Sequence, residues 1–158
     1  RPREECLRIM KDSRAGAMGI VVVVLVLLLK YAALTAMTPE DLSVAILLMP
    51  LAGRCAILVA MASLPYARTE GGLGLLFYSG NSKKSAAVGL LILILLLWQL
   101  SPGVLLPVLC SFLLVVFFFN RWCKTKLGGA TGDTLGAVCE LTEMMTALAL
   151  TTSFQIFL

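Results

Sequence analysis

The sequence predicts an all-α fold, a polytopic bundle of transmembrane helices that forms one integral membrane domain over residues 1–158. The first reason is composition: 59% of the residues are hydrophobic and 14% are charged, whereas soluble domains are about half apolar and a quarter charged. The second is that apolar runs of the length needed to cross a bilayer, about 20 residues, recur along the chain. A β-barrel would show shorter segments of alternating polarity.

Five membrane spans are expected, at residues 17–37, 42–64, 84–100, 103–119 and 133–157. The first four rest on the runs "AMGIVVVVLVLLLKYAALTAM", "LSVAILLMPLAGRCAILVAMASL", "SAAVGLLILILLLWQL" and "GVLLPVLCSFLLVVFFF", and the fifth begins inside the polar stretch "GGATGDTLGAVCE". The third and fourth spans are short and only "SPG" separates them. One hairpin dipping across the membrane is therefore an alternative for that pair.

The basic residues predict the orientation of these spans. Of the 13 lysines and arginines, eleven lie in the N-terminal stretch, in the loop after the second span or in the loop before the fifth, and the two opposite turns hold none. The positive-inside rule then predicts a cytoplasmic N-terminus and an outer C-terminus. The net charge of +4 is interpreted as orientation charge beside anionic lipid.

Several functional classes are disfavoured by composition. The chain has no histidine, the commonest general base and zinc ligand. Its five cysteines are scattered and odd in number, so they are interpreted as small hydrophobic residues rather than a disulfide framework. The basic residues are interpreted as orientation charge, which argues against nucleic-acid binding. Lys30, near the outer end of its span, is expected to snorkel toward the interface.

Three polar segments fall on the predicted cytoplasmic side: "KDSRAG" (residues 11–16), "YARTEGGLG" (66–74) and "GGATGDTLGAVCE" (128–140). In the first, Ser13 or Asp12 would cap the following helix and Arg14 would lie in its first turn. A helix start presents free N–H groups and can hold a phosphate. A simple cap beside a snorkelling arginine is the alternative.

The second segment combines an aromatic residue, an arginine, a carboxylate and three glycines. Arg68 could grip a phosphate with two parallel hydrogen bonds. Gly71, Gly72 and Gly74 would let the backbone approach a ligand closely. The alternative is a flexible loop with ordinary orientation charge.

The third segment gives the strongest functional signal. Gly128 and Gly129 allow a tight turn, and either Thr131 or Asp133 would cap the last helix. Asp133 and Glu140 are seven residues apart and share a helical face. Glu140 would lie about 10 Å and Glu143 about 15 Å beyond Asp133 along that helix.

Carboxylates at such depths are costly, about 2.5–3.5 kcal/mol each at the bilayer centre, and need partners. Arg54 lies inside the second span at about the depth of Glu143, roughly 15 Å from its cytoplasmic end. We therefore expect Arg54 to form an ion pair with Glu143 or Glu140 inside the bundle.

The three segments, in this order, resemble the adenosylcobinamide-GDP ribazoletransferase family, the cobalamin synthases of vitamin B12 assembly. "LRIMKDSRAGAMG" resembles the family's stretch ending in D-S-R-x-G, and "YARTEGGLG" its Y-A-R-x-x-G-L-G loop with one extra glycine. "LGGATGDTLGAVCELTE" resembles its long G-G-x-T-G-D-T-L-G-A-x-x-E-x-x-E signature. The resemblance runs from near Arg1 to beyond Glu143.

The resemblance implies a multi-pass inner-membrane transferase whose active site faces the cytoplasm. Such enzymes join α-ribazole or its 5′-phosphate to adenosylcobinamide-GDP, release GMP and need Mg²⁺. It implies metal or base roles for Asp133 and Glu140, and phosphate contacts from Arg14 and Arg68. The residues that would shape the substrate-binding loops are Ser13, Gly71, Gly129, Thr131 and Thr134.

This sequence departs from the family's pattern in one respect. The family's aspartate-rich D-G-x-A-D-T-x-D-G motif, its expected main Mg²⁺ site, would lie upstream of Arg1, so we expect an N-terminally truncated chain. A homo-oligomer or an association with other cobalamin-assembly enzymes stays open. The alternative functions are a CDP-alcohol-type membrane phosphotransferase, and a transporter or non-catalytic membrane fragment. A transporter would show inverted repeats, and none is convincing in this sequence.

Overall fold

The computed structural model describes residues 2–12, 14, 16–68, 78, 81–100 and 102–156. Most of these residues are helical, and none of them forms a strand beyond the isolated bridge between Tyr66 and Ala130, as predicted. The elements, in chain order, are α1 (Arg3–Ile9), α2 (Ala17–Thr35), α3 (Pro39–Ser63), α5 (Ser82–Leu100), the short 3-10 helix η1 (Pro102–Val104), α6 (Leu105–Leu127) and α7 (Gly132–Ile156).

Four helices of the described part of the chain are long and apolar enough to cross a membrane. They are α2, α3, α5 and the continuous segment of η1 and α6, Pro102–Leu127. The helix α7 has 25 residues, as the fifth predicted span requires, but it is not among the four. Its carboxylates and threonines make it more polar than the others. The membrane character is therefore supported, and the count of five spans stays a prediction.

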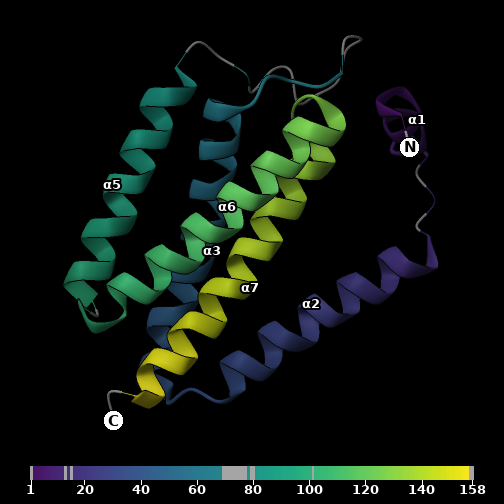
Figure 1. Cartoon of the computed structure of the whole chain (residues 1–158). Coiled ribbons are helices and arrows are strands. Elements are labelled where there is room, and N and C mark those ends of the chain that lie inside the picture. The colour runs from purple at the N-terminus through teal and green to yellow at the C-terminus, as the bar shows by residue number, and fades with distance from the viewer. Residues whose placement is uncertain are drawn as a thin grey trace.

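The helix α7 forms the centre of the bundle and packs against α3, α6 and α2, while α5 packs on α3. In Figure 1, α1, the chain after α3 and the α6–α7 connection lie toward one end. The α2–α3 connection, η1 and the C-terminal end of α7 lie at the other end. The described residues of the three polar segments therefore gather at one end of the molecule, as the alternation of spans predicted.

The helix boundaries differ from the predicted ones at two places. The helix α6 continues to Leu127, eight residues past the expected end, so the basic residues expected in a loop (Arg121, Lys124 and Lys126) are helical. Arginine and lysine are good helix formers, and the helix ends only at Gly128, whose φ of 72° is left-handed. The sequence "TPED", expected as a turn, instead begins α3. Thr38 is its N-cap and Pro39 its first residue.

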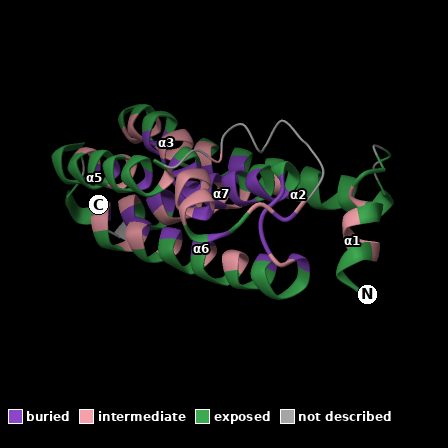
Figure 2. Cartoon of the chain, turned by 90° about the horizontal axis from the view of Figure 1, so that it is seen from above, coloured by how far each residue is buried: buried purple, intermediate pink, exposed green. Residues whose placement is uncertain are grey.

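The helix α2 stands apart from the rest of the bundle and packs chiefly against α7. Only Lys30 and Ala33 are buried in it. Its other apolar side chains, Val21 to Leu25 among them, face outward. Figure 2 shows burial concentrated around α3, α6 and α7, with α2 largely exposed. This apolar surface suits contact with lipid or with another apolar helix.

Candidate functional site

The second and third polar segments are joined by backbone hydrogen bonds. The N–H of Ala67 donates to the carbonyl of Ala130 over 2.8 Å, and the N–H of Ala130 donates to the carbonyl of Pro65 over 2.9 Å. Gly129 makes this approach possible, because a Cβ atom there would lie 2.3 Å from the Pro65 carbonyl oxygen. A side chain at residue 129 would therefore push the two segments apart.

A pair of threonines fixes the start of α7. The N–H of Thr134 donates to Oγ1 of Thr131 over 3.3 Å, and the N–H of Thr131 donates to Oγ1 of Thr134 over 2.8 Å. This reciprocal arrangement works like a capping box. Of the two predicted caps, Thr131 is therefore the one used, and Asp133 is not. Both threonines are buried and engaged with the helix start.

Because Asp133 does not cap α7, its carboxylate is directed to another partner. Nη2 of Arg68 lies 2.9 Å from Oδ2 of Asp133, whose side chain is 62% exposed. The same nitrogen lies 3.5 Å from the carbonyl oxygen of Met10, just beyond α1. Nε of Arg68 is buried and has no hydrogen-bond partner among the described residues. Arg68 thus connects the second and third polar segments with Met10, the residue that precedes the first.

The first polar segment differs from its prediction. The helix α2 begins at Ala17, its N-cap is Gly16, and no side chain caps it, so the cap predicted for Asp12 is wrong. Arg14 precedes the helix rather than lying in its first turn, and its Nη2 is 2.8 Å from Oδ2 of Asp12. The Arg14 guanidinium holds the pKa of the Asp12 carboxyl below its ordinary value, chiefly through side-chain hydrogen bonds. Ser13 and Gly71 lie outside the described residues.

A cluster of four charges lies between α2, α3 and α7, with Lys30 and Glu143 buried and Glu140 and Arg54 more than half exposed. Nζ of Lys30 is 2.6 Å from Oε2 of Glu140 and 2.7 Å from Oε2 of Glu143. Nη1 of Arg54 contacts Oε1 of Glu143, one of the two partners expected for it. The Lys30 side chain is only 11% exposed, so the expectation that it snorkels is wrong. Two cations and two carboxylates balance each other within the bundle.

Two residues that form this cluster, Lys30 and Gly53, were not predicted from the sequence. Arg54, Glu140 and Glu143 alone would leave one uncompensated negative charge in an apolar bundle, which is costly. That imbalance was the signal that Lys30 must point inward. Gly53 is the second: a Cβ atom there would lie 2.7 Å from Cγ of Glu143. The missing side chain makes room for the buried carboxylate.

The two carboxylates with predicted metal or base roles are held by different cations. Asp133 is paired with Arg68, and Glu140, two helical turns further along α7, with Lys30. Within the part of the chain that the structure describes, no three or more histidine, cysteine, aspartate or glutamate side chains are grouped to hold a metal ion. The predicted metal roles of Asp133 and Glu140 stay untested predictions.

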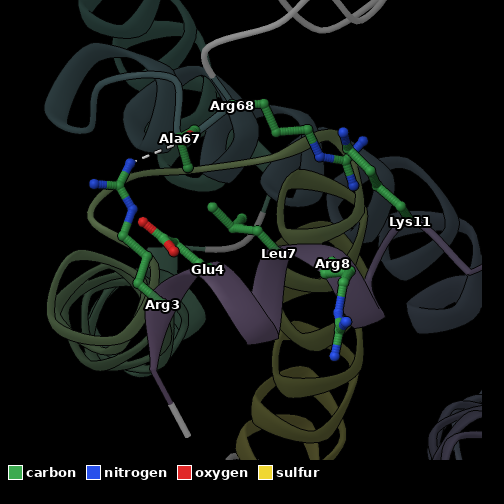
Figure 3. A pocket seen from close by; sticks show the side chains of 7 residues that line it. All are labelled: Arg3, Glu4, Leu7, Arg8, Lys11, Ala67 and Arg68. Atoms are coloured by element: carbon green, nitrogen blue, oxygen red, sulfur yellow. Dashed lines mark hydrogen bonds between the residues drawn. The ribbon is translucent and has the colours of Figure 1, made fainter.

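A cavity of about 360 Å³ opens beside Arg68, between α1 and the chain after α3 (Figure 3). Nη2 of Arg3 donates a 3.0 Å hydrogen bond to the Ala67 carbonyl at its edge. The lining residues are Arg3, Glu4, Leu7, Arg8, Lys11, Ala67 and Arg68. Four of them are basic and one is acidic. The basic residues of α1 had been interpreted as orientation charge alone.

The fold and this polar end together define a helical membrane protein with a cationic, phosphate-compatible site at one end of its bundle. A family model described as cobalamin-5-phosphate synthase matches residues 1–151, and the chain belongs to this family. No solved structure matches the chain.

Curated relatives agree with the family. A protein of Clostridium acetobutylicum is 38% identical over 148 residues, which cover 90% of this chain and 57% of the relative. A relative from Brevibacillus brevis is 34% identical, and the match covers 98% of this chain and 63% of the relative. A relative from Acetivibrio thermocellus is 41% identical, and the match covers 90% of this chain and 58% of the relative. All three are named adenosylcobinamide-GDP ribazoletransferase. The chain thus spans less than two thirds of each of these relatives.

Proposed function

We propose that this chain forms the substrate-holding part of an adenosylcobinamide-GDP ribazoletransferase. The enzyme would join α-ribazole or its 5′-phosphate to adenosylcobinamide-GDP, release GMP and yield adenosylcobalamin or its 5′-phosphate. The observation that carries the proposal is the position of Arg68, whose guanidinium contacts Asp133 and the Met10 carbonyl. One cation therefore stands where the second and third polar segments meet the residue that precedes the first.

The reaction is a displacement at phosphorus. A hydroxyl oxygen of the ribazole forms a bond to the phosphorus that carries cobinamide, and the P–O bond to the GMP portion breaks. GMP leaves with the bridging oxygen, and the hydroxyl proton passes to a base. Since negative charge must be stabilised on the phosphoryl oxygens in the transition state, cations fixed beside them lower the barrier.

The geometry supports distinct roles for the candidate residues. Arg68 is the proposed ligand of the diphosphate, because Asp133 fixes its guanidinium beside the cavity that the basic residues line. Asp133 is the preferred proton acceptor or metal ligand, since its carboxylate is exposed at the end of the bundle. Glu140 is the second candidate, although Lys30 already neutralises it. Arg14 is a weaker phosphate candidate because its guanidinium is bound to Asp12.

The described residues could supply part of a binding site for Mg²⁺. This ion is commonly held by one or two protein carboxylates, with substrate phosphates and water completing its shell. Asp133 offers one such carboxylate, and the described residues bring no group of three acidic ligands together. When bound, Mg²⁺ would neutralise charge on the diphosphate.

The proposed location is the cell inner membrane, with the polar end facing the cytoplasm. The basic residues near that end support this orientation under the positive-inside rule. The exposed apolar side chains of α2 and α5 support direct contact with lipid. They would also suit packing against a second copy or another cobalamin-assembly enzyme.

The proposal is tested by GMP release from membranes that contain the native protein. We expect GMP to appear only when adenosylcobinamide-GDP, a ribazole acceptor and Mg²⁺ are all present. A control without the acceptor separates transfer from hydrolysis. Absence of GMP in the complete reaction would contradict the proposal, and release of CMP from a CDP-alcohol would favour the alternative phosphotransferase.

A further inference from the structure

The short helix α1 is docked at both of its ends onto the second polar segment. Near its start, Nη2 of Arg3 donates to the Ala67 carbonyl, and its guanidinium packs against Gly128, where a Cβ atom would lie 3.0 Å from Cζ of Arg3. Just beyond its end, the Met10 carbonyl accepts from Arg68. The cavity between α1 and Ala67 is therefore a built feature.

The helix α1 contributes charge to this cavity rather than core packing. None of its residues is buried. Figure 3 shows Lys11 and Arg68 reaching toward each other on one side of the cavity, with Arg3 on the other side and Leu7 between them. Among the described residues, no carboxylate pairs with Lys11 or Arg8. The cavity also holds the Glu4 carboxylate, and Arg68 is paired with Asp133, but the four basic residues leave an excess of positive charge that attracts an anion.

We propose that this cavity binds the phosphate group of a nucleoside 5′-monophosphate, with Lys11 and Arg68, whose side chains converge in Figure 3, as its ligands. The identity of the nucleotide rests on the proposed function. The cavity's volume of about 360 Å³ suits a small polar ligand. The half-buried Leu7 gives the cavity one apolar surface. Arg68 is shared with Asp133, so the bound phosphate lies next to the proposed reaction site.

Two nucleotides of the proposed reaction carry such a phosphate: the released GMP, and the 5′-phosphate of α-ribazole. Both present a group with a charge between −1.5 and −2 at neutral pH. The same cations suit either one. The two sources are separated by measuring each nucleotide on its own.

The test is equilibrium binding of GMP, α-ribazole 5′-phosphate and inorganic phosphate to the native protein in nanodiscs of neutral phosphatidylcholine. We expect Lys11→Gln and Arg68→Gln each to weaken binding about tenfold, since each removes a charge-assisted hydrogen bond. Lys83→Gln is the matched control, because this exposed lysine does not line the cavity. Guanosine, which lacks the phosphate, should show no such loss.

Each outcome decides something. A loss confined to GMP identifies the leaving nucleotide, and a loss confined to the ribazole nucleotide identifies the acceptor. A charge-dependent loss for inorganic phosphate supports the cavity even if no GMP is released in the transfer assay, so the two proposals fail separately. Unchanged affinity for all three phosphates in both variants, or equal losses in Lys83→Gln, would overturn the inference.

Discussion

Nζ of Lys30 lies 2.7 Å from Oε2 of Glu143, although the two residues are 113 positions apart. This contact adds to the packing of α2 on the central helix α7, where Thr151 also donates a hydrogen bond to the Ala33 carbonyl. It also brings a second cation to a carboxylate that Arg54 contacts from α3. Three helices are therefore held in register by one buried glutamate.

Removing Lys30 should destabilise the bundle. In Lys30→Met, Glu140 and Glu143 lose a shared cation, and the buried Glu143 loses one of its two partners. Loss of one partner of a buried ion pair costs about 3 kcal/mol or more, so we expect a clearly lower thermal midpoint in detergent. Lys83→Met, an exposed lysine outside the cluster, is the control. A Lys30→Met protein as stable as the wild type would show that the cluster does not hold α2.

Arg54 and Glu143 should be energetically coupled. We expect the effects of Arg54→Ala and Glu143→Ala on unfolding to be non-additive by about 0.5–1 kcal/mol. The value lies at the low end because the Arg54 side chain is 63% exposed in the structure. A double-mutant cycle on the free energy of unfolding measures it. Strict additivity would mean that the contact contributes nothing to stability.

Gly129→Ala should disturb the junction between the second and third polar segments. The added Cβ would lie 2.3 Å from the Pro65 carbonyl oxygen, so the backbone must separate and strain of about 1–3 kcal/mol follows. Gly136→Ala is the matched control, since nothing lies within 4 Å of a Cβ there. We expect the first variant to lose GMP release and the second to keep it. Equal activity of the two would contradict the role given to Gly129.

Chelation should distinguish a metal requirement from a purely cationic site. If Mg²⁺ assists at the diphosphate, EDTA abolishes GMP release and added Mg²⁺ restores it, because the protein's own carboxylates do not form a three-ligand group in the described residues. Thermal stability in EDTA is the parallel measurement and should be unchanged. Full GMP release in EDTA would contradict the Mg²⁺ proposal.

The sequence predicted which segments meet at the polar end better than it predicted the contacts of individual side chains there. The alternation of apolar runs was enough to bring the described parts of the three segments to one end, and the depth of Arg54 was enough to limit its partner to Glu143 or Glu140, of which the structure shows Glu143. The cap of α7 was ambiguous because threonine and aspartate are both good N-caps. Only the backbone geometry selects Thr131 and so leaves Asp133 available to Arg68.

Other features depend on tertiary structure that a linear pattern does not contain. The inward direction of Lys30 depends on how α2 crosses α7, whereas snorkelling is the usual behaviour of a lysine near a span end. The helix α1 is too short to be stable alone, and its contacts to Ala67 and Arg68 come from distant sequence. The cavity beside it was therefore not predictable from the charge pattern.

The most direct test of the central claim is GMP release by membranes that carry Asp133→Asn in the native protein, with Glu40→Gln at the opposite end of α3 as the control. The amide keeps the size of the side chain but removes the charge that faces Arg68. We predict that Asp133→Asn inserts normally and releases GMP at least a hundredfold more slowly, the order lost with an acid–base group. Wild-type rates of GMP release by Asp133→Asn would contradict the assignment of this end of the bundle as the reaction site.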